Sequence, residues 1–303
     1  MTTMQSTIET PQAIHSSAPP AGRGLRTALR PALQWRLMLL WLLALLLPAL
    51  VASLPVWRMF GAAFDRSVHA GVLAQRLDLL AITDLASLHP QHAAALGSGG
   101  IVALVLTLLL SPLLTGAAIT AARAPSPLGF AALAAGGMHE YGRLLRTLLW
   151  AIVPLGVAAF LAGIATGAAE DHAATSVLES SASNGQLGAL IVAGVLLLLA
   201  HATLDAGRAV LALDRRRRSA VLAWGAGIKL LARRPLATLG FYFGVTIVGF
   251  GLAALLAVAR INVPALGAGS FLGGFVLAQL AVLALAWMRC ARLFGLMELA
   301  RPR

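Results

Sequence analysis

Six long apolar runs are the feature of this sequence that most restricts its fold. Each is close to the roughly 20 residues that an α-helix needs to cross about 30 Å of hydrocarbon, and none alternates like a lipid-facing β-strand. Only 11% of the 303 residues are charged, whereas about 25% is usual in soluble domains. The sequence therefore predicts an all-α fold, a six-span transmembrane helix bundle. The predicted spans are residues 37–55, 100–122, 148–168, 187–207, 236–258 and 270–291.

The basic residues predict the orientation of this bundle. Of the 23 Lys and Arg residues, 19 lie in the N-terminal tail, the second and fourth loops and the C-terminal tail, and four lie in the other three loops. Because cytoplasmic loops retain Lys and Arg, we expect a multi-pass protein of the bacterial cytoplasmic (inner) membrane with both termini in the cytoplasm. The formal net charge of +12 is spread beside membrane ends, which favours anionic lipid headgroups or a protein partner over nucleic acid.

The segments between the spans differ in composition. Residues 1–34 are predicted to be a disordered, basic cytoplasmic tail, and residues 35–303 the transmembrane domain. The first outer loop, 56–99, is predicted to hold a helix, and the second, 169–186, to be a solvated acidic loop. Both long inner loops are expected to carry in-plane amphipathic helices on the cytoplasmic side. A repeated unit of two spans plus one such helix remains an open alternative. In the second of these helices the apolar stripe at helical spacing consists of Val221, Trp224, Ile228 and Leu231.

The best candidate polar cluster is His201, Asp205 and Arg208, near the inner end of the fourth span. Their spacing of four and three residues places all three on one face of a helix. Ionisable groups near lipid are costly, so such a cluster is a candidate site for binding a substrate or passing protons. The alternative is a ladder of side chains that only stabilises the end of the helix.

The candidate lipid or partner contacts are basic residues in the fourth loop. They have two interpretations: a determinant of topology, or a docking patch for phospholipid headgroups or an acidic partner. The set consists of Arg215, Arg216, Arg217, Arg218, Lys229, Arg233 and Arg234.

Signatures of catalysis and of metal binding are weak. His89 and His92 form an H-x-x-H pair, but without a fixed carboxylate or cysteine this is a poor metal signature. The sequence has no HExxH, GxSxG or GxxxxGK(S/T) motif, which are the signatures of common hydrolases and nucleotide-binding enzymes. The single cysteine, Cys290, excludes an intrachain disulfide and a metal site built on several thiolates. We predict no catalytic residue, no cofactor and no metal ion.

Three pairs of small residues at a spacing of four predict close helix packing, because such pairs let helix backbones approach one another. They are Gly163 and Gly167, Gly240 and Gly244, and Ser270 and Gly274. In a six-helix protein we expect these contacts to be internal, with dimerisation as the alternative.

The segment Asp205-Ala206-Gly207-Arg208, followed by Arg233-Arg234-Pro235 before the fifth span, resembles uncharacterised bacterial polytopic inner-membrane proteins with six spans. The resemblance concerns the layout of the chain. It implies neither an activity nor a catalytic residue.

Three classes of function fit this sequence. A membrane-embedded scaffold or assembly component is favoured by the lack of ionisable groups in the middle of most spans. A permease component for a weakly charged or lipid-like solute would need a polar cavity between spans, faced by His201 and Asp205. A membrane enzyme acting on lipid would need polar side chains gathered at one headgroup level. In the first outer loop those would be His69, Asp78, Asp84 and His89.

Overall fold

The regular structure of the chain is helical throughout the part that is described. The computed structural model describes residues 31–64, 79–176, 178–217, 219–263 and 267–301, and within these ranges it has no strand. The elements are η1 (Pro31–Leu33), α2 (Trp35–Phe64), α4 (Leu79–Arg123), α5 (Phe130–Trp150), α6 (Ile152–Thr175), α7 (Glu179–Leu213), α8 (Ala220–Arg233), α9 (Pro235–Ile261) and α10 (Gly267–Ala300). Among the described residues, six segments are long and apolar enough to cross a membrane. The all-α class and a multi-pass membrane protein are therefore confirmed.

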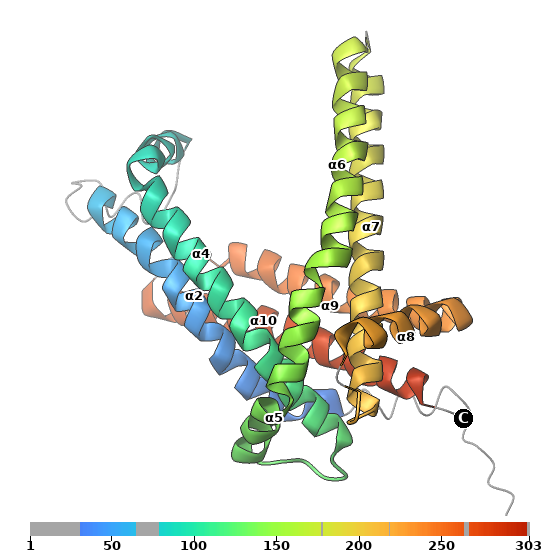
Figure 1. Ribbon diagram of the computed structural model, residues 1–303. Helices are drawn as coiled ribbons and strands as arrows, with labels where there is room; N and C mark the ends of the chain where they lie inside the picture. The colour runs from blue at the N-terminus through green and yellow to red at the C-terminus, as the bar shows by residue number, and fades with distance from the viewer. Residues whose placement is uncertain (1–30, 65–78, 177, 218, 264–266, 302–303) are drawn as a thin grey trace, which may run out of the picture.

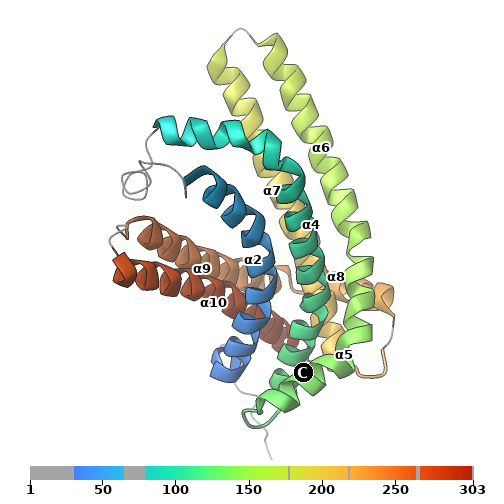
Figure 2. The same cartoon turned by 90° about the vertical axis from the view of Figure 1, so that its left-hand side faces the viewer.

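The helices form three antiparallel hairpins that diverge from a common end. α2 packs on α4, α6 on α7, and α9 on α10. Figures 1 and 2 show the hairpins spreading apart away from the end at which α5 and α8 lie, which we call the basal end. α10 also contacts α7 and α2, so it connects the three hairpins.

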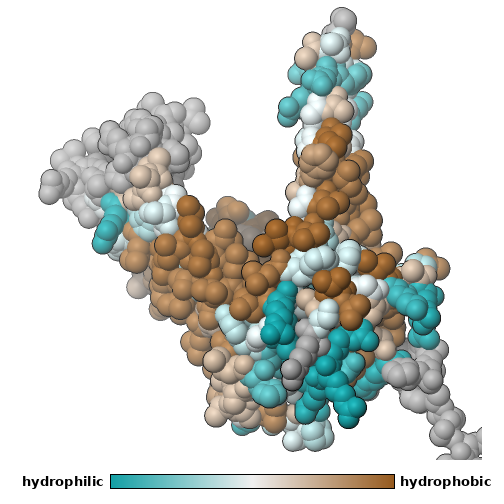
Figure 3. Space-filling model, viewed as in Figure 1, coloured by the Kyte–Doolittle hydropathy of each residue, from teal (hydrophilic) through white to brown (hydrophobic). Residues whose placement is uncertain are grey.

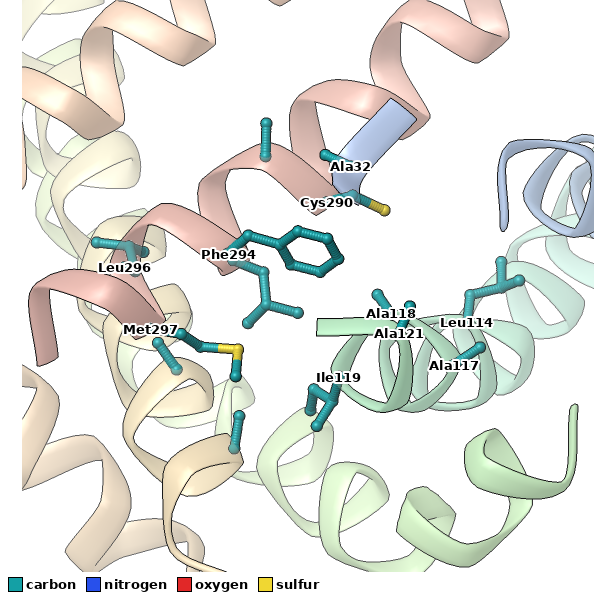
Figure 4. Packing of buried hydrophobic residues seen from close by; sticks show 14 of the residues in the cluster. Ala32, Leu114, Ala117, Ala118, Ile119, Ala121, Cys290, Phe294, Leu296 and Met297 are labelled. Atoms are coloured by element: carbon teal, nitrogen blue, oxygen red, sulfur yellow. The ribbon is translucent and has the colours of Figure 1, made fainter. Parts of the chain in front are cut away.

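The hydrophobic core lies at the basal end. Figure 4 shows the ring of Phe294 of α10 on the side that faces α4, where Ala118 and Ala121 lie. Every residue from 290 to 297 is buried, so this part of α10 is enclosed by protein around its whole circumference. The outer halves of the hairpins instead expose large apolar side chains such as Phe160 and Leu255. Figure 3 shows this apolar surface above a hydrophilic base, as expected of helices that contact lipid.

Two glycine crossings fix α5 and α8 against the spans. A Cβ atom on Gly137 of α5 would lie 2.6 Å from the carbonyl oxygen of Leu113 in α4. A Cβ atom on Gly227 of α8 would lie 2.8 Å from the Cα of Gly207 in α7. Only glycine allows backbones to approach so closely. The first crossing joins α5 to the preceding helix α4, and the second joins α8 to the preceding helix α7.

The ends of α8 follow from local sequence. The Ser219 hydroxyl accepts a hydrogen bond from the backbone N–H of Leu222 at 3.3 Å, which is the usual N-terminal cap. Pro235 disfavours a helical conformation at the residue before it and is well placed in the first turn of α9. Val221 and Ile228 of the predicted stripe are exposed, whereas Trp224 is half-buried against α7.

The predicted internal packing of two glycine pairs is wrong. A Cβ atom on Gly163, Gly167, Gly240 or Gly244 would meet no atom within 4 Å. The hairpins diverge in these regions, so no helix of the described chain lies opposite the glycines. In the third pair, Gly274 does pack closely, against the side chain of Arg260.

The segments between spans are more helical than the sequence suggested. α6 continues to Thr175 and α7 begins at Glu179, so the predicted acidic loop 169–186 is mostly a helical hairpin. Its alanines support helix formation despite the charges. The described parts of the first outer loop, residues 56–64 and 79–99, are also helical. Figure 2 shows the N-terminal part of α4 at a steep angle to the rest. Of the predicted tail, residues 31–33 form η1, in which Ala32 is buried, and residues 1–30 lie outside the described residues.

A candidate binding cavity at the basal end

The predicted polar cluster lies on one face of α7, near its C-terminal end. Arg208 donates a hydrogen bond from Nη1 to Asp205 Oδ1 at 2.9 Å. The other carboxylate oxygen, Oδ2, lies 3.5 Å from His201 Nδ1. The structure therefore brings together the three residues that the helical spacing predicted.

Two residues that the sequence analysis missed complete this cluster. Arg292 of α10 is 5% exposed, and its Nη2 lies 3.5 Å from Asp205 Oδ2. Arg292 also donates from Nη1 to the Tyr242 hydroxyl at 3.2 Å and to Thr246 Oγ1 at 3.3 Å. The Tyr242 hydroxyl of α9 lies 2.9 Å from His201 Nδ1. The cluster thus joins α7, α9 and α10.

A cavity of about 200 Å³ opens beside this cluster, where α2, α4, α6, α7 and α10 converge. The charged residues in its wall are Asp205, Arg208, Arg289 and Arg292, and His201 also lines it. α4 contributes hydroxyl-bearing side chains. Leu108 of α4 and Leu155 of α6 extend the wall into the apolar region between the hairpins. The cavity therefore has a charged floor and partly apolar walls.

Buried hydrogen-bond donors without partners lie in this wall. Trp41 is 3% exposed and lines the cavity, yet its Nε1 has no hydrogen-bond acceptor among the described residues. The same holds for Nε of Arg292. An unsatisfied buried donor is costly, and both of these N–H groups belong to residues that line the cavity.

A second polar cluster at the basal end has a structural role. Glu140 of α5 is 4% exposed and pairs with Arg123 Nη1 and Arg143 Nη1, each at 2.6 Å. Arg123 Nε also donates to the carbonyl oxygen of Ala212 at 2.9 Å, and Arg143 Nη2 to that of Leu211 at 3.0 Å. These cations satisfy carbonyl groups at the C-terminal end of α7, where positive charge is favourable. The cluster ties α4, α5 and α7 together.

The predicted basic contact residues do not form one patch. Arg215 and Arg216 are exposed in the α7–α8 connection, and Arg217 pairs with Asp214 at 3.6 Å. Arg218 lies outside the described residues. Lys229, Arg233 and Arg234 are exposed near the other end of α8. The 14 residues of α8 separate the two groups by about 20 Å at 1.5 Å per residue.

The histidines and carboxylates of the first outer loop cannot be assembled into a site. His69 and Asp78 lie outside the described residues. Asp84, His89 and His92 belong to α4, but their side chains lie outside what the structure describes. Among the side chains that are described, no group of three or more His, Cys, Asp or Glu residues could hold a metal ion.

Comparison of this chain with models of protein families, with curated proteins and with solved structures finds no match. The functional argument therefore rests on the cavity and its surroundings.

Proposed function

We propose that the protein is a permease component of the bacterial inner membrane that receives a lipid-like solute in the basal cavity. The observation that carries this proposal is the cavity itself, which lies between spans and has His201 and Asp205 in its wall. A permease requires a polar cavity faced by such residues. A cluster that only stabilises the end of a helix requires no cavity.

The shape of the molecule supports an amphiphilic solute. Figure 3 shows a notch with apolar sides between the hairpin of α2 and α4 and the hairpin of α6 and α7. Leu108 of α4 and Leu155 of α6, one from each of these hairpins, line the cavity. At about 200 Å³, the cavity is smaller than the roughly 300 Å³ at which pockets for drug-sized ligands begin. It accommodates a polar head, while the notch provides an apolar path for the attached chain.

The proposed orientation places the basal end in the cytoplasm, together with both termini. Support comes from the concentration of Arg and Lys residues in the segments at this end, since such segments resist translocation. In this orientation the exposed side chains of Arg215, Arg216, Lys229, Arg233 and Arg234 contact anionic headgroups of the inner leaflet. Reporter fusions within residues 124–129 and within residues 176–178 test the orientation. We expect a cytoplasmic signal only from the first, and the reverse pattern would overturn it.

The binding proposal is tested by blocking the cavity. Ser111 of α4 lines it, so Ser111→Trp places an indole ring inside. Val105→Trp on the exposed surface of the same helix is the matched control. The purified proteins are equilibrated with amphiphiles in detergent, and the retained molecules are measured by native mass spectrometry. We expect the wild type and Val105→Trp to retain the amphiphile. Ser111→Trp should lose it, while the melting temperature of this variant stays unchanged. Equal retention by all three proteins would contradict the proposal.

A scaffold or assembly component is the second candidate, supported by the unoccupied glycine faces of α6 and α9. Gly163, Gly167, Gly240 and Gly244 have open space around them, and small residues allow a further helix to approach closely. Gly167→Leu and Gly244→Leu should then weaken a complex detected by cross-linking in membranes, whereas Gly142→Leu on α5 should not. An unchanged cross-linking pattern in the first two variants would exclude these faces as interfaces.

A further inference from the structure

We infer that the group bound in the basal cavity is the phosphate monoester of a lipid. This inference rests on the proposed function, because it names the chemistry of the solute that the cavity would receive. The evidence for the inference is the balance of charges and hydrogen-bond donors in the cavity wall.

The wall carries more positive than negative charge. It contains three arginines, Arg208, Arg289 and Arg292, and one carboxylate, Asp205. Guanidinium groups do not lose their proton in proteins, so with His201 neutral the wall has an excess of two positive charges. Arg292 is 5% exposed and Arg208 is half-buried, whereas Arg289 is exposed. A charge that is removed from water, such as that of Arg292, requires a counter-charge close by. The cavity is therefore suited to an anion.

The internal pairing leaves several N–H donors available, beside the hydroxyl groups that Thr107, Ser111 and Thr115 of α4 contribute to the wall. Asp205 Oδ1 is bound by Arg208, while Oδ2 lies 3.5 Å from both Arg292 and His201. Arg289 is not among the described ion-pair partners of this carboxylate. The guanidinium of Arg289 lines the cavity, and the wall residues Trp41 and Arg292 each carry one buried N–H without an acceptor among the described residues, Nε1 and Nε respectively. A ligand that matches them must present several acceptor oxygens.

A phosphate monoester meets both requirements. It carries a charge of about −1.5 to −2 at pH 7 and has three strong acceptor oxygens, whereas a carboxylate or a phosphate diester carries a single charge. Arginine also binds phosphate in a bidentate geometry. Attachment to a lipid is favoured over free phosphate because the cavity wall also contains apolar side chains, among them Leu108 of α4 and Leu155 of α6.

The experiment compares lipids that differ only in their headgroup. The whole protein is placed in phosphatidylcholine nanodiscs with a guest lipid of matched chains: phosphatidic acid, phosphatidylglycerol or diacylglycerol. Retention is measured by native mass spectrometry, and inorganic phosphate is added as a competitor. We expect phosphatidic acid to be retained at least about tenfold more strongly than the diester phosphatidylglycerol, because it makes one additional charged hydrogen-bonding contact. Millimolar inorganic phosphate should compete poorly with phosphatidic acid.

Substitution of Arg289 locates the preference within the cavity. Arg289→Gln should reduce the retention of phosphatidic acid roughly tenfold, and Arg289→Lys should reduce it less. Arg58→Gln, which removes the same charge from an exposed site on α2 outside the cavity and outside the proposed headgroup contacts, should have little effect. If Arg289→Gln does not fold, the headgroup comparison and the competition on the wild type still decide the outcome.

The outcomes separate this inference from the proposed function. If the wild type retains all three guests equally and Ser111→Trp still releases them, the phosphate assignment fails and the permease proposal remains. Retention of no guest overturns both. Displacement by inorganic phosphate at the concentration at which phosphatidic acid binds would show an anion site that does not select a lipid, and would also overturn the inference.

Discussion

The crossing of α8 over α7 can be tested with two neighbouring glycines of α8. In Gly227→Ala, the new Cβ would contact the backbone N of Gly207 and lie 2.8 Å from the Gly207 Cα and 2.9 Å from the carbonyl carbon of Ala206. Favourable carbon–carbon contacts begin at about 3.5 Å, so α8 would have to move by about 0.7 Å, the difference between 3.5 Å and the 2.8 Å contact. All these atoms belong to the backbone, so no change of rotamer relieves the contact. Gly225→Ala is the matched control, because its Cβ would meet nothing within 4 Å.

The expected magnitudes follow from the packing and from helix propensity. Overpacking of this kind costs about 1–3 kcal/mol, and backbone contacts this short place Gly227→Ala near the upper end of that range. Replacing glycine by alanine inside a helix stabilises by about 1 kcal/mol in both variants. We therefore expect Gly225→Ala to be slightly more stable than the wild type, and Gly227→Ala to be about 3 kcal/mol less stable than Gly225→Ala. For 150–250 residues, 1 kcal/mol shifts Tm by about 2–4 °C, so the two variants should differ by roughly 6–12 °C.

The buried thiol of Cys290 provides the assay. It is the single cysteine of the sequence and is 1% exposed, so a maleimide dye reacts with it only when the core opens. The midpoint of labelling in a detergent thermal ramp reports unfolding for each variant. Equal midpoints for Gly227→Ala and Gly225→Ala would refute the close crossing of α7 and α8.

Two further predictions concern polar contacts at the basal end. Glu140→Gln removes the buried charge that pairs with two arginines, so we expect the free energy of unfolding to fall by about 3–5 kcal/mol. The same labelling assay measures this change, with Glu170→Gln at an exposed site as the control. Equal midpoints for the two variants would count against a structural role of the cluster. Trp224→Phe removes the hydrogen bond from Nε1 to Thr203 Oγ1 at 2.9 Å, so the free energy of unfolding should fall by about 1 kcal/mol. Trp57→Phe, at a side chain that is 78% exposed, should leave the labelling midpoint unchanged. Equal midpoints for both variants would show that this hydrogen bond does not stabilise the protein.

The helical class and the positions of the spans follow from hydropathy, because a chain in hydrocarbon must satisfy its backbone hydrogen bonds internally. The cluster of His201, Asp205 and Arg208 was predictable for a similar reason, since helical periodicity alone decides which side chains share a face. Arg292 and Tyr242 were not predictable in this way. Arg292 and Tyr242 are 50 residues apart in the sequence, and their meeting depends on how separate helices pack.

The glycines show the same limit of sequence patterns. Gly163 and Gly167 match a packing motif, yet an added Cβ on either would meet nothing within 4 Å. Ala223 and Gly227 have the same spacing but were not singled out, and Gly227 makes a backbone contact with Gly207. A local motif of small residues indicates that helices can approach closely there, but the arrangement of the hairpins decides which of these sites meets another helix. One signal was present but not used: Leu293, Phe294, Leu296 and Met297 continue the apolar pattern beyond the predicted sixth span, and all four are buried.

The enclosure of α10 by the other helices has a consequence for biogenesis. This helix is synthesised after every other described helix, yet its residues 290–297 fill the space between the three hairpins. At about 5–20 residues per second, the 34 residues of α10 take roughly 2–7 s to emerge from the ribosome. During that interval the earlier spans can insert into the bilayer as hairpins but cannot bury the surfaces that later face α10. The order of translation therefore requires that final assembly follow membrane insertion, with the basal cavity forming last.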